Sequence, residues 1–364
     1  MIKMNSPQFP SENTEAFTEN TDETVHPPVP MQPEMIPPKK VFSRFALSIA
    51  ICYIVSTVLS SICMIIMQSV GLSQNNFLGS TSTLFLVTDI PLYCIGIPLI
   101  WLMLRKIPVS TAKPQKLPAP TLIKCFLISI SSVFVGNILS GILSSLLTMG
   151  RAQNAVSNAL SSVEIISSIL LVICAPIMEE LVFRKWCIDR LSPYGEVWAV
   201  LFSAICFSLF HMNLYQFFYT FALGLVSGYI YVRSRKIIYS ILLHALLNLT
   251  TGVIAPLATS GINYDTLEEI QKATENGQTI SPELISSFLP GFLTAFAYLS
   301  IFFIMVLVGF ILFIISIKKI HFEPSTVLTT KSEGLRAMLL NVGAIIFIIL
   351  SVISSIANLV LSFQ

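Results

Sequence analysis

Long apolar runs are the feature of this sequence that most constrains its fold. Seven of them reach about 18 residues or more with few charges, which is the length an α-helix needs to cross the hydrocarbon of a bilayer. A segment that spans lipid must satisfy its own backbone hydrogen bonds, so these runs predict helices. They lie near residues 42–67, 82–104, 122–148, 164–185, 237–256, 291–317 and 337–361.

An eighth apolar region, residues 197–233, is harder to divide. It is interrupted by the polar stretch "HMNLYQ", which suits either two short spans or a re-entrant hairpin. Two segments here bring the count to nine. Hydrophobic residues make up 54% of the chain and charged residues 11%, far from the balance of a soluble globular domain. We therefore predict an all-α, polytopic membrane helix bundle with about eight or nine transmembrane segments.

The basic residues predict the orientation, because cytoplasmic loops carry an excess of Lys and Arg. Groups such as Lys39–Lys40, Arg105–Lys106 and Arg233–Lys236 alternate with loops that are nearly free of cations. This pattern places the N-terminus in the cytoplasm and the C-terminus outside. Since topology accounts for the cations, the net charge of +2 gives no reason to expect a nucleic-acid partner.

The segments outside the spans complete the expected organisation. The first forty residues are polar and Pro-rich, without an apolar run that would form a core, so we expect a disordered cytoplasmic tail. The expected parts are the tail 1–40, N-terminal transmembrane helices 41–150, a core 164–252, a polar extracytoplasmic loop 257–290 and C-terminal transmembrane helices 291–364.

Ionisable side chains inside the spans are candidate functional residues, because each costs about 2.5 to 3.5 kcal/mol at a helix centre unless it has a partner. Asp89 belongs to no motif, and we interpret it as a structural hydrogen-bonding group. The remaining ones, in the spans or at their edges, are Glu164, Glu179, Glu180, Arg184, His211 and His244.

The stretch "EELVFR" contains an adjacent pair of carboxylates, Glu179 and Glu180. Glu180 and Arg184 stand at i and i+4 and share one helix face, so Arg184 is expected to neutralise Glu180 as a structural ion pair. Glu179 is rotated about 100° away and is left without a local partner. It is therefore the carboxylate that we expect to have a chemical role.

Two further motifs place imidazoles in apolar segments. "FSLFH" puts Phe207 one turn before His211, and "HALLN" puts His244 and Asn248 on one helix face. Each has an ordinary interpretation, since His211 would also serve as a helix cap and His244 with Asn248 as an interhelical hydrogen-bonding pair. Their occurrence together with a carboxylate pair points to chemistry.

These residue types suit hydrolysis of an amide bond. The reaction needs a base to activate water, a group that handles the proton for the leaving nitrogen, and donors for the developing oxyanion. A carboxylate in an apolar cavity is a stronger base because desolvation disfavours its charged form, so Glu179 fits the first role. His211 would share the water or protonate the leaving group, while neutral His244 and the amide of Asn248 would donate to the oxyanion.

Helix rise places these side chains at comparable depths, with one exception. Glu179 and His244 lie about 9 and 12 Å in from the nearest cytoplasmic lysines. His211 counts about 22 Å in from Glu196. We therefore expect the segment of His211 to be tilted or re-entrant, or to have a cytoplasmic end later than Glu196.

In order, "EELVFR", "FSLFH" and "HALLN" resemble the Glu-Glu-x-x-x-Arg, Phe-x-x-x-His and His-x-x-x-Asn motifs of the CPBP intramembrane protease family. That family includes type II CAAX prenyl endopeptidases and bacterial bacteriocin-processing and immunity proteins. The resemblance covers residues 164–252, which we interpret as a CAAX protease-like catalytic core. It implies a multi-pass protein of a bacterial plasma membrane that cleaves a membrane-associated protein or peptide in the lipid bilayer.

The resemblance also implies a role for each motif residue. Glu179 would match the carboxylate that activates water, His211 the imidazole that acts with it, and His244 with Asn248 the pair that stabilises the oxyanion. The supporting positions would be Glu180, Arg184 and Phe207.

The cofactor stays open at this level. Two imidazoles and a carboxylate are the ligand set of many hydrolytic zinc sites, so Glu179, His211 and His244 are candidate zinc ligands. The family that the motifs resemble is often labelled metalloprotease, yet a direct Glu/His mechanism without tightly bound zinc is also proposed for it.

Two other classes of function use the same buried polar residues. A transporter would relay protons or hold a ligand with them, and a bacteriocin-immunity or scaffold protein would keep the motifs without turnover. Against a transporter, the hydropathy pattern has no internal repeat. Other protease classes do not fit, because the sequence lacks the His-Glu-x-x-His, Gly-x-Gly-Asp and Gly-x-Ser-Gly motifs.

Overall fold

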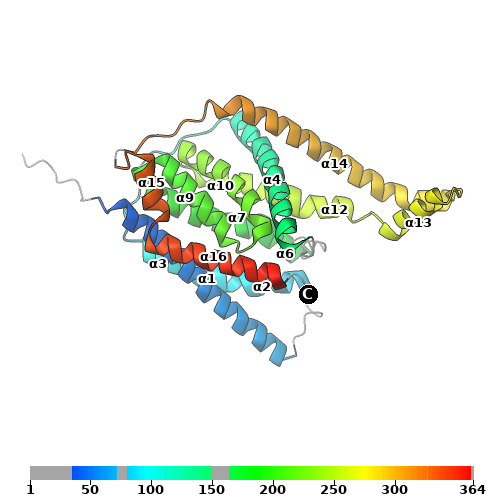
Figure 1. The fold of residues 1–364 in the computed structure, drawn as a ribbon, viewed down its shortest axis with the longest axis horizontal. Coiled ribbons are helices and arrows are strands. Elements are labelled where there is room, and N and C mark those ends of the chain that lie inside the picture. The colour runs from blue at the N-terminus through cyan, green and yellow to red at the C-terminus, as the bar shows by residue number, and fades with distance from the viewer. Residues whose placement is uncertain (1–34, 72–79, 111, 150–163, 326, 362–364) are drawn as a thin grey trace, which may run out of the picture. The chain divides into compact units, whose positions relative to one another are not determined.

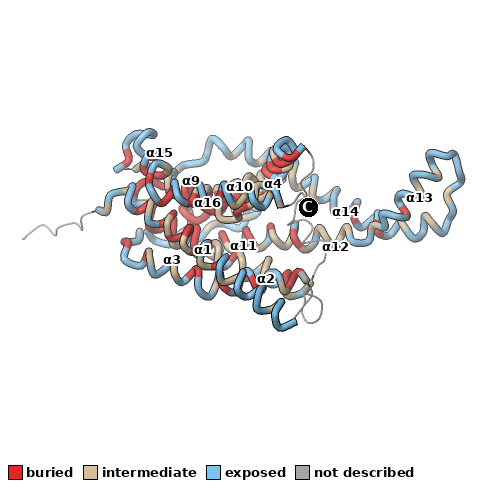
Figure 2. The backbone as a smooth tube through the Cα atoms, turned by 60° about the horizontal axis from the view of Figure 1, so that its bottom comes forward, coloured by how far each residue is buried: buried red, intermediate tan, exposed pale blue. Residues whose placement is uncertain are grey.

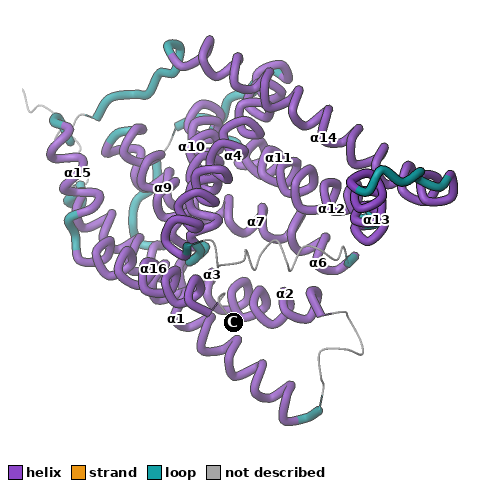
Figure 3. Tube along the Cα trace, turned by 45° about the vertical axis from the view of Figure 1, so that its right-hand side comes forward, coloured by secondary structure: helices purple, strands orange, loops and turns teal. Residues whose placement is uncertain are grey.

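The computed structural model describes residues 35–71, 80–110, 112–149, 164–325 and 327–361, and it is helical with no strand in these residues (Figure 3). Seven segments are long and apolar enough to cross a membrane, which confirms the seven runs predicted from the sequence and the polytopic helical fold. They are Pro38–Ser69, Thr81–Leu104, Ala119–Thr148, Ile165–Tyr194, Ile237–Thr259, Pro282–Ile317 and Val342–Val360.

Three of these spans contain a π-helical segment that ends two residues before a proline. The second span joins α2 (Ser80–Pro91), η1 (Leu92–Gly96) and α3 (Ile97–Leu104). The fifth joins α11 (Ile237–Asn248), η5 (Leu249–Ile254) and α12 (Ala255–Thr259). The fourth joins α6 (Ile165–Ile169), η2 (Leu170–Cys174), α7 (Ala175–Glu180), a second π-helical segment η3 (Leu181–Ile188), α8 (Asp189–Leu191) and the 3₁₀ turn η4 (Ser192–Tyr194).

Proline explains η1, η2 and η5, because it has no N–H to donate to the preceding turn. The prolines concerned are Pro98, Pro176 and Pro256. A local shift to i→i+5 pairing in a helix is often found at functional sites. The fourth span also runs to Tyr194, whereas the apolar run in the sequence predicts an end near residue 185.

The ambiguous region 197–233 forms two helices, α9 (Glu196–Phe210) and α10 (Leu214–Ser234), joined by the turn His211–Asn213. The 15 residues of α9 rise about 22 Å, which is less than the roughly 30 Å of a hydrocarbon core. The polar stretch "HMNLYQ" contains the turn at which the chain reverses between the two helices.

The remaining helices are α1 (Pro38–Ser69), α4 (Ala119–Thr148), α13 (Tyr264–Glu275), α14 (Pro282–Ile317), α15 (Lys331–Leu339) and α16 (Val342–Leu361) (Figure 1). The expected extracytoplasmic loop 257–290 contains α13 and the first turns of α14. Of the expected N-terminal tail, residues 1–34 lie outside the described residues.

Helix pairs approach closely where a glycine of one helix faces the backbone of the other. A side chain at Gly136 of α4 would collide with the backbone of Tyr219 in α10, and one at Gly309 of α14 would collide with the carbonyl of Leu127 in α4. Such small-residue contacts are the usual means by which helices associate in lipid. They fix both α10 and α14 against α4.

Buried residues concentrate around α1 and α9 (Figure 2). The ring of Phe42 in α1 packs edge-on against Phe202 in α9, with centroids 4.9 Å apart. The exposed side chains of α14 are mostly apolar, as a lipid-facing helix requires.

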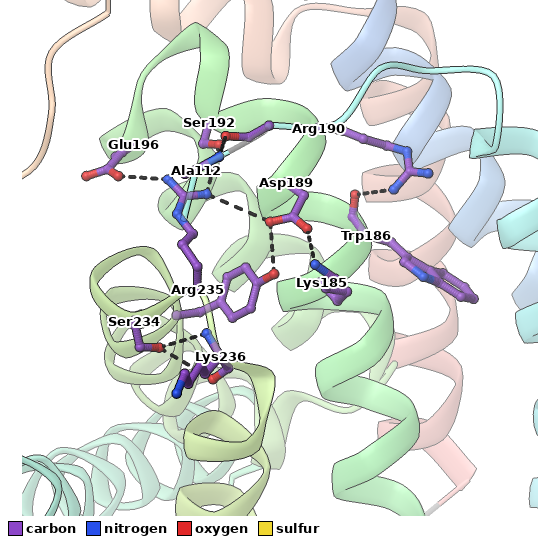
Figure 4. Close-up of polar contacts among 12 residues, drawn as sticks. Ala112, Lys185, Trp186, Asp189, Arg190, Ser192, Glu196, Ser234, Arg235 and Lys236 are labelled. Atoms are coloured by element: carbon purple, nitrogen blue, oxygen red, sulfur yellow. Dashed lines mark hydrogen bonds and ion pairs between the residues drawn. The ribbon is translucent and has the colours of Figure 1, made fainter. Parts of the chain in front are cut away.

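A polar cluster ties helix ends together at one end of the bundle (Figure 4). The guanidinium of Arg235, which follows α10, lies 2.9 Å from Glu196 Oε1 and 3.8 Å from Asp189 Oδ1. The hydroxyl of Tyr231 donates to Asp189 Oδ1 at 2.8 Å, and Lys185 Nζ lies 2.7 Å from its Oδ2. The ends of the fourth span, α9 and α10 therefore share one level, which we call the basic end.

At the start of α2, a carboxylate from another span serves as the helix cap. Glu164, just before α6, accepts a hydrogen bond from the backbone N–H of Ser82 at 2.7 Å. The first N–H groups of a helix have no acceptor within the helix. Hydrogen bonds from Ser82 hold the pKa of the Glu164 carboxyl below its usual range.

This contact predicts acid sensitivity. Because the pKa of Glu164 is lowered in the folded state, its contact with Ser82 stabilises the fold at neutral pH. This stabilisation is lost as the pH falls through the folded-state pKa. Acidification should lower the unfolding temperature of the parent more than that of Glu164→Gln, whose amide does not titrate. Thermal unfolding at pH 7 and pH 4 measures this, with Glu283→Gln as the exposed control, and equal acid sensitivity of parent and Glu164→Gln would contradict it.

Candidate active site

Two carboxylates and one imidazole meet between the fourth span and α11. Nδ1 of His244 lies 3.1 Å from Glu180 Oε1, and Nε2 of the same ring lies 3.7 Å from Glu179 Oε2. Glu180 is fully buried, while 17% of the Glu179 side chain is exposed. Glu179, which was expected to lack a partner on its own helix, thus has one on α11.

The predicted contact between Glu180 and Arg184 is present. Arg184 Nε lies 2.9 Å from Glu180 Oε2, and both side chains are fully buried. The approach is an ion pair rather than an aligned hydrogen bond, since neither atom has a hydrogen-bond partner among the described residues. The guanidinium carbon also lies 4.6 Å from the centroid of the Phe207 ring, a cation–π contact that helps to compensate a buried charge.

The Glu180 carboxylate therefore contacts two side chains, whereas the sequence predicts only the contact with Arg184. One carboxylate oxygen faces Arg184 and the other faces Nδ1 of His244. An ionised carboxylate only accepts hydrogen bonds, so Glu180 requires a proton on Nδ1 and leaves Nε2 facing Glu179. The sequence could not indicate this second contact, because it depends on the packing of α11 against the fourth span.

The ring of Phe207 lies between the two histidines. Its centroid is 5.0 Å from that of His211 and 5.7 Å from that of His244, and both contacts are edge-to-face. Nδ1 of His211 lies 2.9 Å from the carbonyl oxygen of Phe207 and must donate to it. This bond makes His211 the C-terminal cap of α9 and leaves its Nε2 as the nitrogen that accepts a proton.

Depths counted from the basic end differ less than those predicted from the sequence. Counted from Asp189 and Arg235, Glu179 and His244 lie about 15 and 13 Å in. Counted from Glu196, Phe207 lies about 16 Å in and His211 about one turn deeper. Because side chains on a helix lean towards its N-terminus, and Nδ1 of His211 reaches back to the Phe207 carbonyl, the imidazole lies less deep than the His211 backbone and closer to the level of the other groups.

Asn248 makes a contact that its expected role does not include. Its amide nitrogen donates to the carbonyl oxygen of Leu171 in η2 at 2.9 Å. In this π-helical turn the N–H of Ala175 donates to the carbonyl of Leu170, five residues earlier. The same pattern would pair the carbonyl of Leu171 with the N–H of residue 176, but residue 176 is a proline and has no N–H. Asn248 supplies the donor that Pro176 lacks, and its second amide hydrogen is not used by this bond.

The candidate zinc ligands do not fit a metal. The described residues contain no group of three or more His, Cys, Asp or Glu side chains placed to hold an ion. Nδ1 of His244 faces Glu180, and Nδ1 of His211 is engaged by a backbone carbonyl, which leaves Nε2 of each ring as the atom that an ion would bind. In this structure the two Nε2 atoms and the Glu179 carboxylate do not form a group placed to hold an ion.

Other residues near Glu179 were not singled out as part of the site. Asp89 and Tyr93, which hydrogen-bond to each other on the second span, both lie within electrostatic range of Glu179, as does Tyr219 of α10. Asp89, which the sequence analysis interprets as a structural hydrogen-bonding group, is therefore a charged neighbour of Glu179 in electrostatic terms. The i, i+4 spacing of Asp89 and Tyr93 was the available signal.

Comparison with known proteins matches part of this site to a family. Residues 161–250 match the family of type II CAAX prenyl endopeptidase Rce1-like proteins. The match includes Glu179, Glu180, Arg184, His211, His244 and Asn248. No curated protein and no solved structure matches the chain.

Proposed function

We propose that this chain, whose residues 161–250 match the type II CAAX prenyl endopeptidase Rce1-like family, is an intramembrane endopeptidase. Its substrate is a membrane-associated protein or peptide, cleaved where the fourth span, α9 and α11 meet. The protein acts in a plasma membrane with its N-terminus and basic end on the cytoplasmic side. The Lys and Arg residues of that end support this orientation.

The observation that carries the proposal is the position of His244 between two carboxylates. Glu180 holds one ring nitrogen at 3.1 Å, and the other lies 3.7 Å from Glu179. A buried imidazole that only holds helices together needs one hydrogen-bonding partner, whereas His244 has two. The second partner, Glu179, is the more exposed of the two carboxylates, as a group that contacts water must be.

In the proposed reaction, Glu179 takes a proton from water, and the water oxygen attacks the carbonyl carbon of the scissile amide. His211 accepts through its free Nε2 and shares the water. Nδ1 of His244 already carries the proton that Glu180 accepts, so the ring donates from Nε2 only as a positively charged imidazolium, not in the neutral form expected from the sequence. That imidazolium and the unused amide hydrogen of Asn248 donate to the oxyanion. The C–N bond then breaks, and the proton taken from water passes to the leaving nitrogen.

The test uses the full chain in lipid vesicles with a prenylated CAAX peptide and its unprenylated form, and products are identified by mass. Parent protein should cut the peptide, and His244→Ala should lose about 10²-fold or more of that rate. His321→Ala is the matched control, because His321 is largely exposed and distant in sequence. Equal cleavage by both variants would refute the proposed role of His244.

Three further outcomes of this test distinguish the rival functions. Inhibition by a chelator with rescue by zinc would assign a metal despite the poor fit of the donors. Absence of cleavage by folded parent protein, with any membrane-associated peptide, would favour an immunity, scaffold or transport role. Cleavage of only the unprenylated peptide would keep the protease and replace the substrate class.

A further inference from the structure

The turn that carries His211 has an unfavourable backbone. Met212 is in the left-handed region, with φ 48°, although it has a Cβ and is 3% exposed. Residues other than Gly, Asn and Asp seldom adopt this conformation, and they keep it only where the surroundings require it. Some contact must therefore hold residues 211–213 in place.

Hydrogen bonds within the turn satisfy most of its backbone. The N–H of Met212 donates to Leu209 at 3.1 Å, and that of Gln216 donates to Asn213 at 3.1 Å. The side chain of Asn213 accepts from the N–H of Tyr215 at 2.9 Å. The carbonyl of Met212 is bonded from outside the turn.

Its donor is Asn358, near the end of α16. The amide nitrogen of Asn358 lies 2.8 Å from the carbonyl oxygen of Met212, 146 residues away in the sequence. The only other polar side chains of α16 are serines. In lipid an unpaired carboxamide and an unpaired carbonyl are both costly, so each requires the other.

We propose that Asn358 is a positioning residue for His211 and that α16 is thereby a functional part of the active site. The helix lies outside residues 161–250, which match the protease family. Its bond fixes the Met212 carbonyl, and the turn in this state places His211 so that Nδ1 reaches the Phe207 carbonyl. The consequence for catalysis rests on the proposed function, whereas the consequence for the turn does not.

Hydrogen exchange tests the structural step. In the full-length protein in lipid, Asn358→Leu and the smaller Asn358→Ala should speed exchange of the amides in residues 209–216 by about threefold to tenfold. Residues 128–144 of α4 and 41–56 of α1 should exchange as in the parent, which shows that the bundle is folded. Ser355→Ala is the control, because Ser355 is on the same helix and makes no side-chain hydrogen bond among the described residues.

Kinetics test the functional step. Both Asn358 variants should lower kcat for the cleaved peptide about threefold to tenfold and leave KM unchanged, because the proposed role of Asn358 is to position His211 and not to bind substrate. Parent-like exchange at residues 209–216 in both variants would overturn the positioning role. Faster exchange with an unchanged kcat would overturn the link to catalysis. If the parent cleaves nothing, the protease assignment fails and the exchange result still decides the role of Asn358.

Discussion

Glu179→Gln should abolish most cleavage while leaving the fold intact. Gln has the shape of Glu but cannot take a proton from water, so the loss should be about 10²- to 10⁴-fold in kcat. The side chain is partly exposed and ion-pairs only with His244, at 3.7 Å, among the described residues. Replacing it removes no fully buried ion pair, so the unfolding temperature should stay close to that of the parent.

Single-turnover cleavage of the CAAX peptide in vesicles measures the loss, and thermal unfolding checks the fold. Glu283→Gln makes the same chemical change in the exposed first turn of α14 and should cleave at the parent rate. Parent-like cleavage by Glu179→Gln would remove Glu179 from the mechanism. The base would then have to be sought elsewhere, with Asp89 a carboxylate within electrostatic range on a different span.

The seven spans were predictable because membrane helices are read from length and apolarity alone. The boundary at residue 185 was wrong because charged residues such as Lys185 suggested a helix end. Here the helix continues into the basic end, where Asp189 binds Lys185. Local spacing also predicted the Glu180–Arg184 contact, since the register within one helix is fixed.

Contacts between spans were not predictable to the same degree. Glu180 and His244 are 64 residues apart, and their bond depends on the relative rotation of two helices. The role of Asn248 at Leu171 follows from Pro176 once the π-helical turn is known, but a proline alone does not tell which side chain replaces its missing N–H. The positions of interhelical polar bonds are set by packing of small residues, which sequence spacing does not encode.

The second large effect is on stability. Arg184→Met should destabilise the protein by about 3 to 5 kcal/mol, because it removes the guanidinium that faces the fully buried Glu180 carboxylate. Met fills most of the volume that Arg184 occupies against Phe207, so the loss of stability measures the unpaired charge rather than a cavity. Denaturant or thermal unfolding in lipid measures it, and Arg105→Met, at an exposed site beside Trp101, is the control. A loss below about 1 kcal/mol would mean that the pair behaves as a surface ion pair.

The double variant Glu180→Gln/Arg184→Met then separates the two roles of Glu180. With the charge removed from both partners, much of the stability should return, because the cost of breaking a buried pair lies mainly in the unpaired charge. The carboxamide introduced by Glu180→Gln can still accept from Nδ1 of His244 but no longer supports a positive imidazole. If that support matters, cleavage should stay about 10- to 100-fold below the parent although the protein is stable. Full cleavage by the stable double variant would mean that Glu180 serves only to neutralise Arg184. The positive charge of His244 would then depend on Glu179.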